Sequence, residues 1–297
     1  MSLAALTVPT YDDARVVVPA PAPGAGNWAG AASAVLVDGT FWLTYRVRRP
    51  LDEGRGVSVV VARSDDGERF TPVAEVHRDA FGCESFERPV LVPVPGVGWR
   101  LYLSCATPGS KHWWVDSLTA ATPEELPGGE RVLVLPGDDT VAVKDSVVTH
   151  GADGWEMLLC CHPLTDTGHE DRMTSRLLRS SDGLSWTDHG EVLAGRPGEW
   201  DARGARATAV LPDVDGRPRT ILYDGRPDAA SNWFETTGVA TWDGARYVAV
   251  DGPPISSPHS DGAWRYASAV PLPDGRVRFY VEAARPDGAH DLVTVVR

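Results

Sequence analysis

The sequence predicts an all-β protein, a five-bladed β-propeller with four antiparallel strands in each blade. Its content of glycine (30), proline (24) and tryptophan (11) suits a chain of short strands and tight turns. One pattern recurs five times: an apolar strand, a glycine-containing turn and a second strand rich in aromatic and aliphatic residues. None of these segments shows the 3.6-residue periodicity of a helical repeat, which disfavours a helical solenoid.

The five repeats are spaced as propeller blades are. With one valine of each inner strand as the reference point, the spacings are 55, 57, 63 and 60 residues, which leaves room for four short strands. The reference residues are Val35, Val90, Val147, Val210 and Val270. Because propellers reach this length as one unit, we expect residues 1–297 to form a single domain.

Two of the repeats continue into a recognisable second hairpin. Residues 59–76 and 175–193 each contain a Ser-Asp-Gly turn, followed by Phe70 or Trp186 to pack against the blade. These turns resemble the Asp-box-like turns of propeller glycosidases. Because such turns lie on the outside of blades, we expect them to be structural.

The last repeat reaches the end of the sequence after three strands. These are expected near residues 266–272, 276–283 and 291–296. The segment that starts at Ala14 precedes the first inner strand and has no partner in its own repeat. We therefore expect the strand near Arg15–Val18 to pair with Leu292–Val296 as the outer strand of the last blade, which leaves no open edge.

Charge and hydropathy narrow the classes of function. A net charge of −13 disfavours non-specific binding to nucleic acid or to an anionic membrane. No apolar run is long enough to span a bilayer, and the first residues lack a signal-peptide pattern, so the sequence predicts a soluble, cytoplasmic protein. The cysteines show no metal-ligand spacing, so we expect buried free thiols and neither a metal nor another cofactor. They are Cys83, Cys105, Cys160 and Cys161.

Candidate functional residues lie where two strands of each blade meet. The start of an innermost strand lies beside the end of its antiparallel neighbour, so both positions open onto the same face of the ring. The strand starts include Trp28, Glu87, Arg88, Lys144, Asp145, Arg206, Arg265 and Tyr266, and the second-strand ends include Arg46, His162, Asp224, Arg226 and Glu282. Convergent carboxylates and guanidinium groups suit a polar-ligand pocket, although ion pairs can also line a propeller axis for structural reasons.

The remaining histidines are weaker candidates. Five of them fall in turns or at strand ends and are expected at the surface. They are His77, His150, His189, His259 and His290. By contrast, His112 adjoins Trp113 and Trp114 and could belong to a substrate-binding loop.

With these strand starts, the chain resembles the five-bladed propeller superfamily of arabinanases, β-xylosidases, invertases and levansucrases. Inner-strand starts in those enzymes supply three carboxylates: a base or nucleophile, a general acid and an orienting group. The resemblance implies that Asp145, within Lys144–Val148, is the orienting carboxylate. It also implies that Glu87, within Phe86–Val90, is a catalytic or sugar-binding carboxylate.

The chain departs from the family pattern in two blades. The first inner strand has Gly30–Ser33 where the family has its base, and the fourth has Arg203–Arg206 where it has its acid. Asp224 and Glu282, at second-strand ends, could replace the missing groups. A nearby arginine would lower the pKa of either carboxyl and favour a base, whereas burial alone would raise that pKa and favour an acid. The sequence leaves both alternatives open.

Three functions follow. The first is a glycoside hydrolase or related carbohydrate-active enzyme that uses Glu87, Asp145, Asp224 and Glu282 in some combination. The second is a glycoside phosphorylase or an enzyme for an acidic sugar, because guanidinium groups bind phosphate or carboxylate in a bidentate manner. The third is a sugar-binding propeller without catalysis. In each, the expected partner is a small carbohydrate, bound by Trp28, Arg46, Arg88, Lys144, His162, Arg206, Arg226, Arg265 and Tyr266.

Overall fold

Antiparallel strands build almost all of the regular structure. The computed structural model describes residues 8–213 and 216–297. Hairpin connections join consecutive strands into five units of four strands, numbered here in chain order. Unit 1 contains β2 (Trp28–Val37), β3 (Thr40–Arg48), β4 (Gly56–Ser64) and β5 (Thr71–His77), and unit 2 contains β6 (Phe86–Val94), β7 (Gly98–Ala106), β8 (Trp113–Ala120) and β9 (Glu130–Leu135). Three short 3₁₀ helices, Leu51–Glu53, Arg78–Phe81 and Pro123–Gly128, lie in the connections among the described residues.

The second half of the chain repeats this arrangement. Unit 3 contains β10 (Val141–Gly151), β11 (Gly154–Pro163), β12 (Thr174–Ser180) and β13 (Thr187–Ala194), and unit 4 contains β14 (Gly204–Val210), β15 (Thr220–Arg226), β16 (Thr236–Trp242) and β17 (Tyr247–Ala249). Unit 5 contains β18 (Trp264–Pro271), β19 (Val277–Ala284), β20 (His290–Val296) and β1 (Arg15–Val18). The observed architecture is therefore all-β and propeller-like, as expected.

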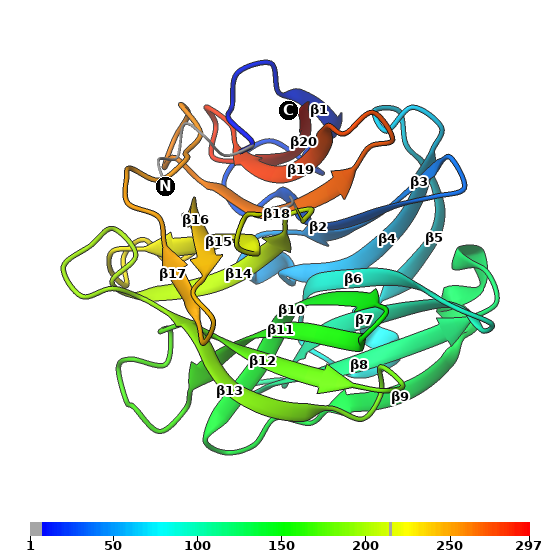
Figure 1. Cartoon of the computed structure of the whole chain (residues 1–297), viewed down its shortest axis with the longest axis horizontal. Coiled ribbons are helices and arrows are strands. Elements are labelled where there is room, and N and C mark those ends of the chain that lie inside the picture. The colour runs from blue at the N-terminus through cyan, green and yellow to red at the C-terminus, as the bar shows by residue number, and fades with distance from the viewer. Residues whose placement is uncertain (1–7, 214–215) are drawn as a thin grey trace.

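The first strands of the units surround a common axis. Contacts run from β2 to β6, β10, β14 and β18 and back to β2. Figure 1 shows these strands towards the middle of the molecule, with the later strands of each unit further out. Apolar clusters fill the spaces between neighbouring units; Tyr102 of unit 2, for example, packs in one cluster with Val148 and Met157 of unit 3. Each strand thus buries one face against the next unit.

The N-terminal strand joins the last unit, as the sequence predicts. Arg15 pairs with Thr294 and Val18 with Leu292, antiparallel. A single parallel pair, Trp28 with His290, links this unit to the first. The two ends of the described chain therefore share one sheet (Figure 1).

Every first strand carries a bulge at the same level. Pairing with the second strand is interrupted between Gly30 and Ser33, Phe86 and Pro89, Lys144 and Val147, and Arg265 and Ser268. In unit 4 the interruption lies between Ala207, which still pairs with Tyr223, and Ala209. The residues at the first position of this level are Ala31, Glu87, Asp145, Ala207 and Tyr266, and those at the second are Ala32, Arg88, Ser146, Thr208 and Ala267. A bulge re-aims side chains, so these ten residues decide what faces the axis.

The Ser-Asp-Gly turns lie in outer hairpins. In the turn that joins β4 to β5, the Ser64 and Asp66 side chains accept hydrogen bonds from the following backbone N–H groups. Ser180 and Asp182 do the same between β12 and β13. Neither turn contributes to the hollows around the axis, as expected of structural turns.

Two further sequence expectations can be compared with the fold. The four cysteines are buried and free. No helix among the described residues is long and apolar enough to cross a membrane.

Candidate active site

A polar hollow of about 410 Å³, the upper cavity, lies where the first strands begin. Eight of the nine sequence-predicted substrate-binding residues line it: Trp28, Arg46, Lys144, His162, Arg206, Arg226, Arg265 and Tyr266. They come from four units, and Glu87 adds unit 2. Strand starts and second-strand ends thus meet on one face, as the antiparallel arrangement requires.

The four predicted catalytic carboxylates converge, but at two depths. Glu87 lines the upper cavity. Asp145, Asp224 and Glu282 are each 0% exposed and lie behind the lining residues. None of the four points to the outer surface, but only Glu87 faces the cavity directly.

Arg206 connects two of the buried carboxylates. Its Nη1 donates to Asp145 Oδ2 at 3.0 Å, and its Nη2 donates to Asp224 Oδ2 at 2.8 Å. The Tyr266 hydroxyl lies 2.8 Å from Arg206 Nη1 and 3.3 Å from the Oδ2 atom of Asp145. Arg206 is therefore the shared counter-ion of two carboxylates.

Glu282 occupies the space beside Gly30. A Cβ atom on Gly30 would lie 2.0 Å from Glu282 Oε2, so no larger residue fits there without displacing the carboxylate. Arg265 donates to Glu282 Oε1 at 2.9 and 2.7 Å, and the Ala31 N–H donates to Oε2 at 3.0 Å. The second strand of unit 5 thus supplies a carboxylate beside the first strand of unit 1.

Glu87 is held among donors at the cavity surface. Arg46 donates to Glu87 Oε2, and the Tyr266 hydroxyl lies 3.3 Å from the same atom. Its place in the bulge explains its position, because Glu87, Asp145 and Tyr266 occupy equivalent positions in three units. In units 1 and 4 the equivalent residues are Ala31 and Ala207, which carry no functional group to the axis.

The surroundings of each buried carboxyl group decide between the two alternatives, a lowered pKa that favours a base and a raised pKa that favours an acid. Burial opposes ionisation of Asp145, but Lys144 and Arg206 nevertheless hold its pKa below the usual range. Burial likewise opposes ionisation of Glu282, yet Arg265 and the His290 hydrogen bond keep its pKa well below normal. For Asp224, burial outweighs Arg206 and raises the pKa. Basic partners therefore favour the anionic forms of Asp145 and Glu282, whereas burial favours the protonated form of Asp224 more than at the other two carboxyl groups.

Burial also shifts the pKa values of two other residues that line the cavity. Burial lowers the pKa of Lys144, although Asp145, whose Oδ2 is 3.5 Å from Nζ, partly offsets it. Burial, together with Lys144 and Arg226, lowers the pKa of His162 to about 3. His162 Nδ1 lies 3.1 Å from the Glu170 carbonyl oxygen, so the proton is assigned to Nδ1. Neutral His162 is thus a hydrogen-bonding group rather than an acid at neutral pH.

Several cavity residues were missed by the sequence analysis. Glu235, just before β16, accepts hydrogen bonds from Arg226 and Arg265 and lines the cavity. Trp233 on the same loop also lines it and has a φ of 80°, a strained backbone for a non-glycine residue. Arg55 follows the first 3₁₀ helix and lies 3.8 Å from Glu87 Oε1. These residues lie outside first-strand starts and second-strand ends, so the strand rule gave no signal for them.

Indole rings form part of the cavity wall. Trp28, Trp113 and Trp233 all line it. The Arg48 guanidinium lies 3.8 Å from the centre of the Trp28 ring, and Lys144 Nζ lies 4.7 Å from that of Trp113. Aromatic faces beside cations offer both apolar stacking and polar contacts to a ligand.

Two predicted placements are wrong, those of Arg88 and His290. Arg88 does not line the upper cavity but a hollow on the opposite side of the bulges. His290, expected at the surface, is 0% exposed, with Nδ1 2.9 Å from Glu282 Oε1 and its ring stacked on Trp28. His112 lies in the predicted loop, but it lines a separate surface hollow, while its neighbours Lys111 and Trp113 line the upper cavity. A shift of one residue in a strand or bulge turns a side chain to the opposite face of the sheet, which explains such misplacements.

Hydrogen-bond donors exceed acceptors at the cavity. The Nε groups of four lining arginines, Arg46, Arg55, Arg206 and Arg226, are buried without a partner. None of the carboxylate oxygens of the five acids described above is in that state within the described residues. The arginines that line the cavity make it rich in hydrogen-bond donors, which suits a ligand with oxygen acceptors.

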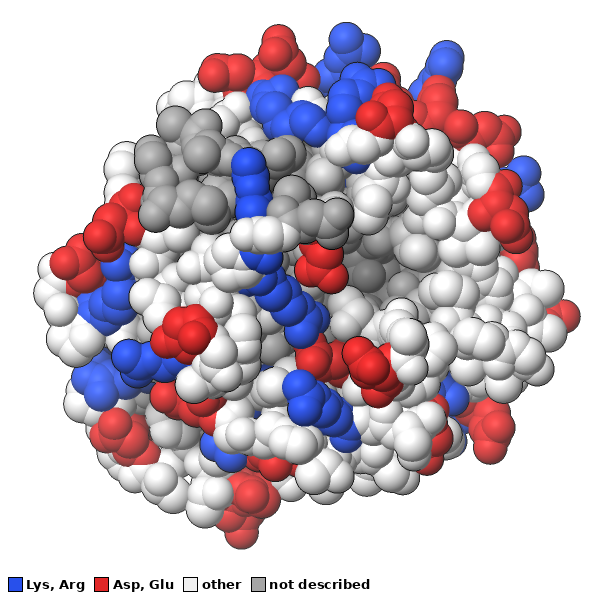
Figure 2. Space-filling view, viewed as in Figure 1, with Lys and Arg blue, Asp and Glu red and all other residues white. Residues whose placement is uncertain are grey.

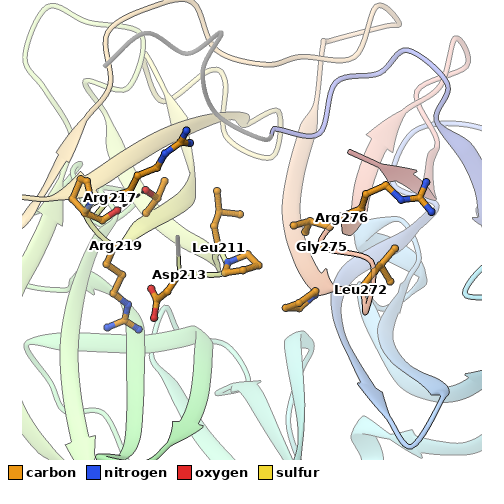
Figure 3. Close-up of a pocket in the computed structure, with 12 residues that line it drawn as sticks. Leu211, Asp213, Arg217, Arg219, Leu272, Gly275 and Arg276 are labelled. Carbon is orange, nitrogen blue, oxygen red and sulfur yellow. Dashed lines mark hydrogen bonds between the residues drawn. The ribbon is translucent and has the colours of Figure 1, made fainter. Parts of the chain in front are cut away.

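The other axial hollow differs in chemistry. The lower funnel, about 560 Å³, is lined mainly by apolar residues around the ends of the first strands, among them Val35, Val90, Val147 and Val210. It shares Leu211, Pro212 and Pro271 with a groove between units 4 and 5, shown in Figure 3. Within residues 8–213 and 216–297, no group of three or more His, Cys, Asp or Glu side chains is arranged to hold a metal ion.

Comparison with known proteins establishes the fold. No sequence family and no curated protein matches the chain. A thermostable family-43 glycoside hydrolase has a TM-score of 0.69 at 14% identity, covering 98% of this chain and 91% of that chain. An α-L-arabinofuranosidase from Lactobacillus brevis has a TM-score of 0.63 at 12% identity, with 90% of each chain covered. The β-1,2-mannobiose phosphorylase from Listeria innocua has a TM-score of 0.59 at 15% identity, covering 98% and 92%. The chain therefore shares the fold of this group of proteins.

Proposed function

We propose that the chain is a carbohydrate-active enzyme, a glycoside hydrolase that binds a small glycoside or oligosaccharide in the upper cavity. The observation that carries the proposal is the convergence of Glu87, a wall of tryptophans and a set of guanidinium donors in one hollow at the axis. Sugar rings stack on aromatic faces, and their hydroxyl oxygens accept hydrogen bonds from such donors. The shared fold with glycoside hydrolases supports the class of reaction by analogy.

Glu87 is the residue we assign to proton transfer or nucleophilic attack. Its carboxylate reaches the cavity. Arg46 and the Tyr266 hydroxyl contact the Oε2 atom, whereas Arg55 lies beside the Oε1 atom. Glu235 is the second cavity-facing carboxylate. Asp145, Asp224 and Glu282 act in this proposal behind the lining, where they orient and neutralise Arg206, Arg265 and Lys144. Hydrolysis needs two groups on opposite sides of the glycosidic bond, and Glu87 with Glu235 are the pair to test.

A second candidate is a glycoside phosphorylase or an enzyme for an acidic sugar. The several guanidinium groups that line the cavity favour it, because such groups bind phosphate or a sugar carboxylate in a bidentate manner. The shared fold with a mannobiose phosphorylase agrees with this alternative. A sugar-binding protein without catalysis is the third candidate, favoured by Ala31 and Ala207 at two of the bulge positions.

We further propose that the five units are the blades of one five-bladed β-propeller spanning residues 1–297, with β1 as the outer strand of the last blade. The ring of contacts among first strands and the pairing of β1 with β20 support this architecture. The sequence also supports a cytoplasmic protein with no need for a cofactor.

Turnover of aryl glycosides and small oligosaccharides, neutral and uronic, with and without phosphate, tests the three candidates. We expect Glu87→Gln to lower kcat/KM at least 100-fold, the scale of lost proton transfer, with the fold intact. Glu84→Gln, an exposed neighbour also near Arg55, is the matched control and should retain activity. Turnover only with phosphate would assign the phosphorylase, turnover only of uronic substrates the acidic-sugar enzyme, and sugar binding without any cleavage the binding protein.

A further inference from the structure

The second residues of the five bulges form a layer across the axis below the ion pairs. They are Ala32, Arg88, Ser146, Thr208 and Ala267. Arg88 is 3% exposed, and its Nη2 donates to the carbonyl oxygens of Ala32 at 3.0 Å and Ala267 at 3.1 Å. One guanidinium group therefore reaches from unit 2 to the strands of units 1 and 5.

This layer holds polar groups that the protein does not satisfy. Arg88 Nε and Nη1, Ser146 Oγ and Thr208 Oγ1 are buried without a hydrogen-bond partner. Ser146 and Thr208 are 1% and 0% exposed. Leaving such groups unpaired is unfavourable, most of all for a charged group, so a ligand that pairs with them gains affinity.

Arg88 and Thr208 both line the lower funnel, which places the unpaired groups at its inner end. The described lining residues include no Asp, Glu or Lys, so Arg88 is the one permanent charge among them. The walls are mainly valines, prolines and leucines, with Ser33, Thr149, His150 and Ser268 among them. Figure 2 shows a hollow on the visible face with uncharged residues along its upper and right borders and charged side chains along its left and lower borders.

We propose that the lower funnel is a second ligand site, which takes a monocarboxylate with an apolar body. The carboxylate accepts hydrogen bonds from Arg88 and the adjacent hydroxyl of Thr208, and the apolar body packs against Val90, Val147 and Val210. Its volume lies within the range of about 300–1,000 Å³ typical of small-molecule sites. A carboxylate matches the planar guanidinium fork, and burial of the apolar body against the valines favours binding.

The chemistry of the lining excludes the ligands of the upper cavity. Sugars and phosphate need many polar partners, whereas this wall offers hydrocarbon beyond the first layer. Arg88 remains protonated at neutral pH, since burial lowers its pKa only to about 10. The groove of Figure 3 continues the space sideways from Leu211, Pro212 and Pro271, so a chain of several carbons has room.

Calorimetric titration with octanoate tests this site, with octanol and acetate as probes that lack the charge or the apolar body. We expect octanoate to bind at least tenfold more tightly than either. Ala269→Phe, which fills the funnel without touching Arg88, should weaken octanoate binding at least tenfold, and Thr208→Val should weaken it severalfold. Lys144→Gln in the upper cavity is the control and should leave it unchanged.

Arg88→Met should abolish the preference for octanoate over octanol, and circular dichroism would report whether this variant still folds. If it does not fold, Ala269→Phe and Thr208→Val still decide the matter. Equal affinity for octanol and octanoate, binding that survives Ala269→Phe, or no binding at all would overturn the proposal. Because no step depends on turnover in the upper cavity, failure here is distinguishable from failure of the proposed hydrolase.

Discussion

The upper cavity and the lower funnel are built from the same five strands, but they have opposite chemistry. Above the bulges, carboxylates and guanidinium groups pair within and between units, as Arg206 does with Asp224 of its own unit and with Asp145 of unit 3. Below them, valines surround a single guanidinium, Arg88, which has no ion pair. The difference arises within two residues, since Glu87 lines one hollow and Arg88 the other. A bulge therefore directs neighbouring side chains of one strand into two different environments.

The two regions also differ in what their charges stabilise. In the upper cavity each buried carboxylate depends on an arginine of another strand, and removal of one partner leaves an unpaired buried charge. In the lower layer the Arg88 guanidinium donates to the backbone carbonyl groups of Ala32 and Ala267, and the Arg88 backbone N–H donates to Asp145 Oδ1. The loss of Arg88 leaves polar but uncharged groups behind, so we expect the upper cavity to be the more sensitive region.

The largest effect is expected from Arg206→Met compared with Arg88→Met. Both arginines are almost fully buried, but only Arg206 neutralises carboxylates. We expect Arg206→Met to lower the free energy of unfolding by about 3–5 kcal/mol and Arg88→Met by about 1–3 kcal/mol. Urea denaturation of both variants measures the difference.

An exposed pair provides the control for that comparison. Arg176 lies 2.7 Å from Asp188, and their side chains are 38% and 46% exposed. Water and salt screen such a pair, so Arg176→Met should cost at most about 1 kcal/mol. If Arg88→Met were as costly as Arg206→Met, the distinction between the two regions would be wrong.

Sequence reasoning predicted the architecture well because it depends on repeated patterns. The valine spacing marked all five first strands, and the unpaired segment near Arg15 was correctly assigned to β20. The strand-end rule then placed most of the lining residues. It could not separate Glu87 from Arg88, since nothing in their residue types reveals where pairing slips by one residue. Glu235 and Trp233 were missed for another reason: they reach the cavity from a loop, and the strand-end rule considers only the ends of strands.

The next largest effect on stability is expected at the close contact between Glu282 and Gly30 of unit 1. Gly30→Ala would place a Cβ 2.0 Å from Glu282 Oε2 and 2.4 Å from its Cδ, so the carboxylate must move away from Arg265. We expect the free energy of unfolding to fall by about 1–3 kcal/mol, as in other overpacked sites. Thermal or urea unfolding measures it.

A double-mutant cycle isolates this clash. Gly151→Ala is the control, because no atom lies within 4 Å of the added Cβ, and its effect should stay within about 0.5 kcal/mol. In a Glu282→Ala background the clash is absent, so Gly30→Ala should cost clearly less than in the parent protein. Equal costs in both backgrounds would show that Glu282 does not depend on the glycine.

The smallest effect is expected from Thr208→Val in the lower layer. Thr208 is 0% exposed and its hydroxyl has no partner, so valine of similar volume removes an unsatisfied polar group rather than a hydrogen bond. Stability should therefore stay unchanged or rise by up to about 1 kcal/mol, whereas truncation of a bonded buried hydroxyl costs energy. Ser175, whose hydroxyl donates to the Ala205 carbonyl and accepts from the Ala207 N–H, is the matched comparison. Ser175→Ala should destabilise by about 1–3 kcal/mol, because it leaves the N–H of Ala207 unpaired. If Thr208→Val destabilised the protein as much as Ser175→Ala does, the Thr208 hydroxyl would have a hydrogen-bond partner in solution. The lower layer would then hold one unsatisfied polar group fewer, and its contrast with the ion pairs of the upper cavity would be weaker.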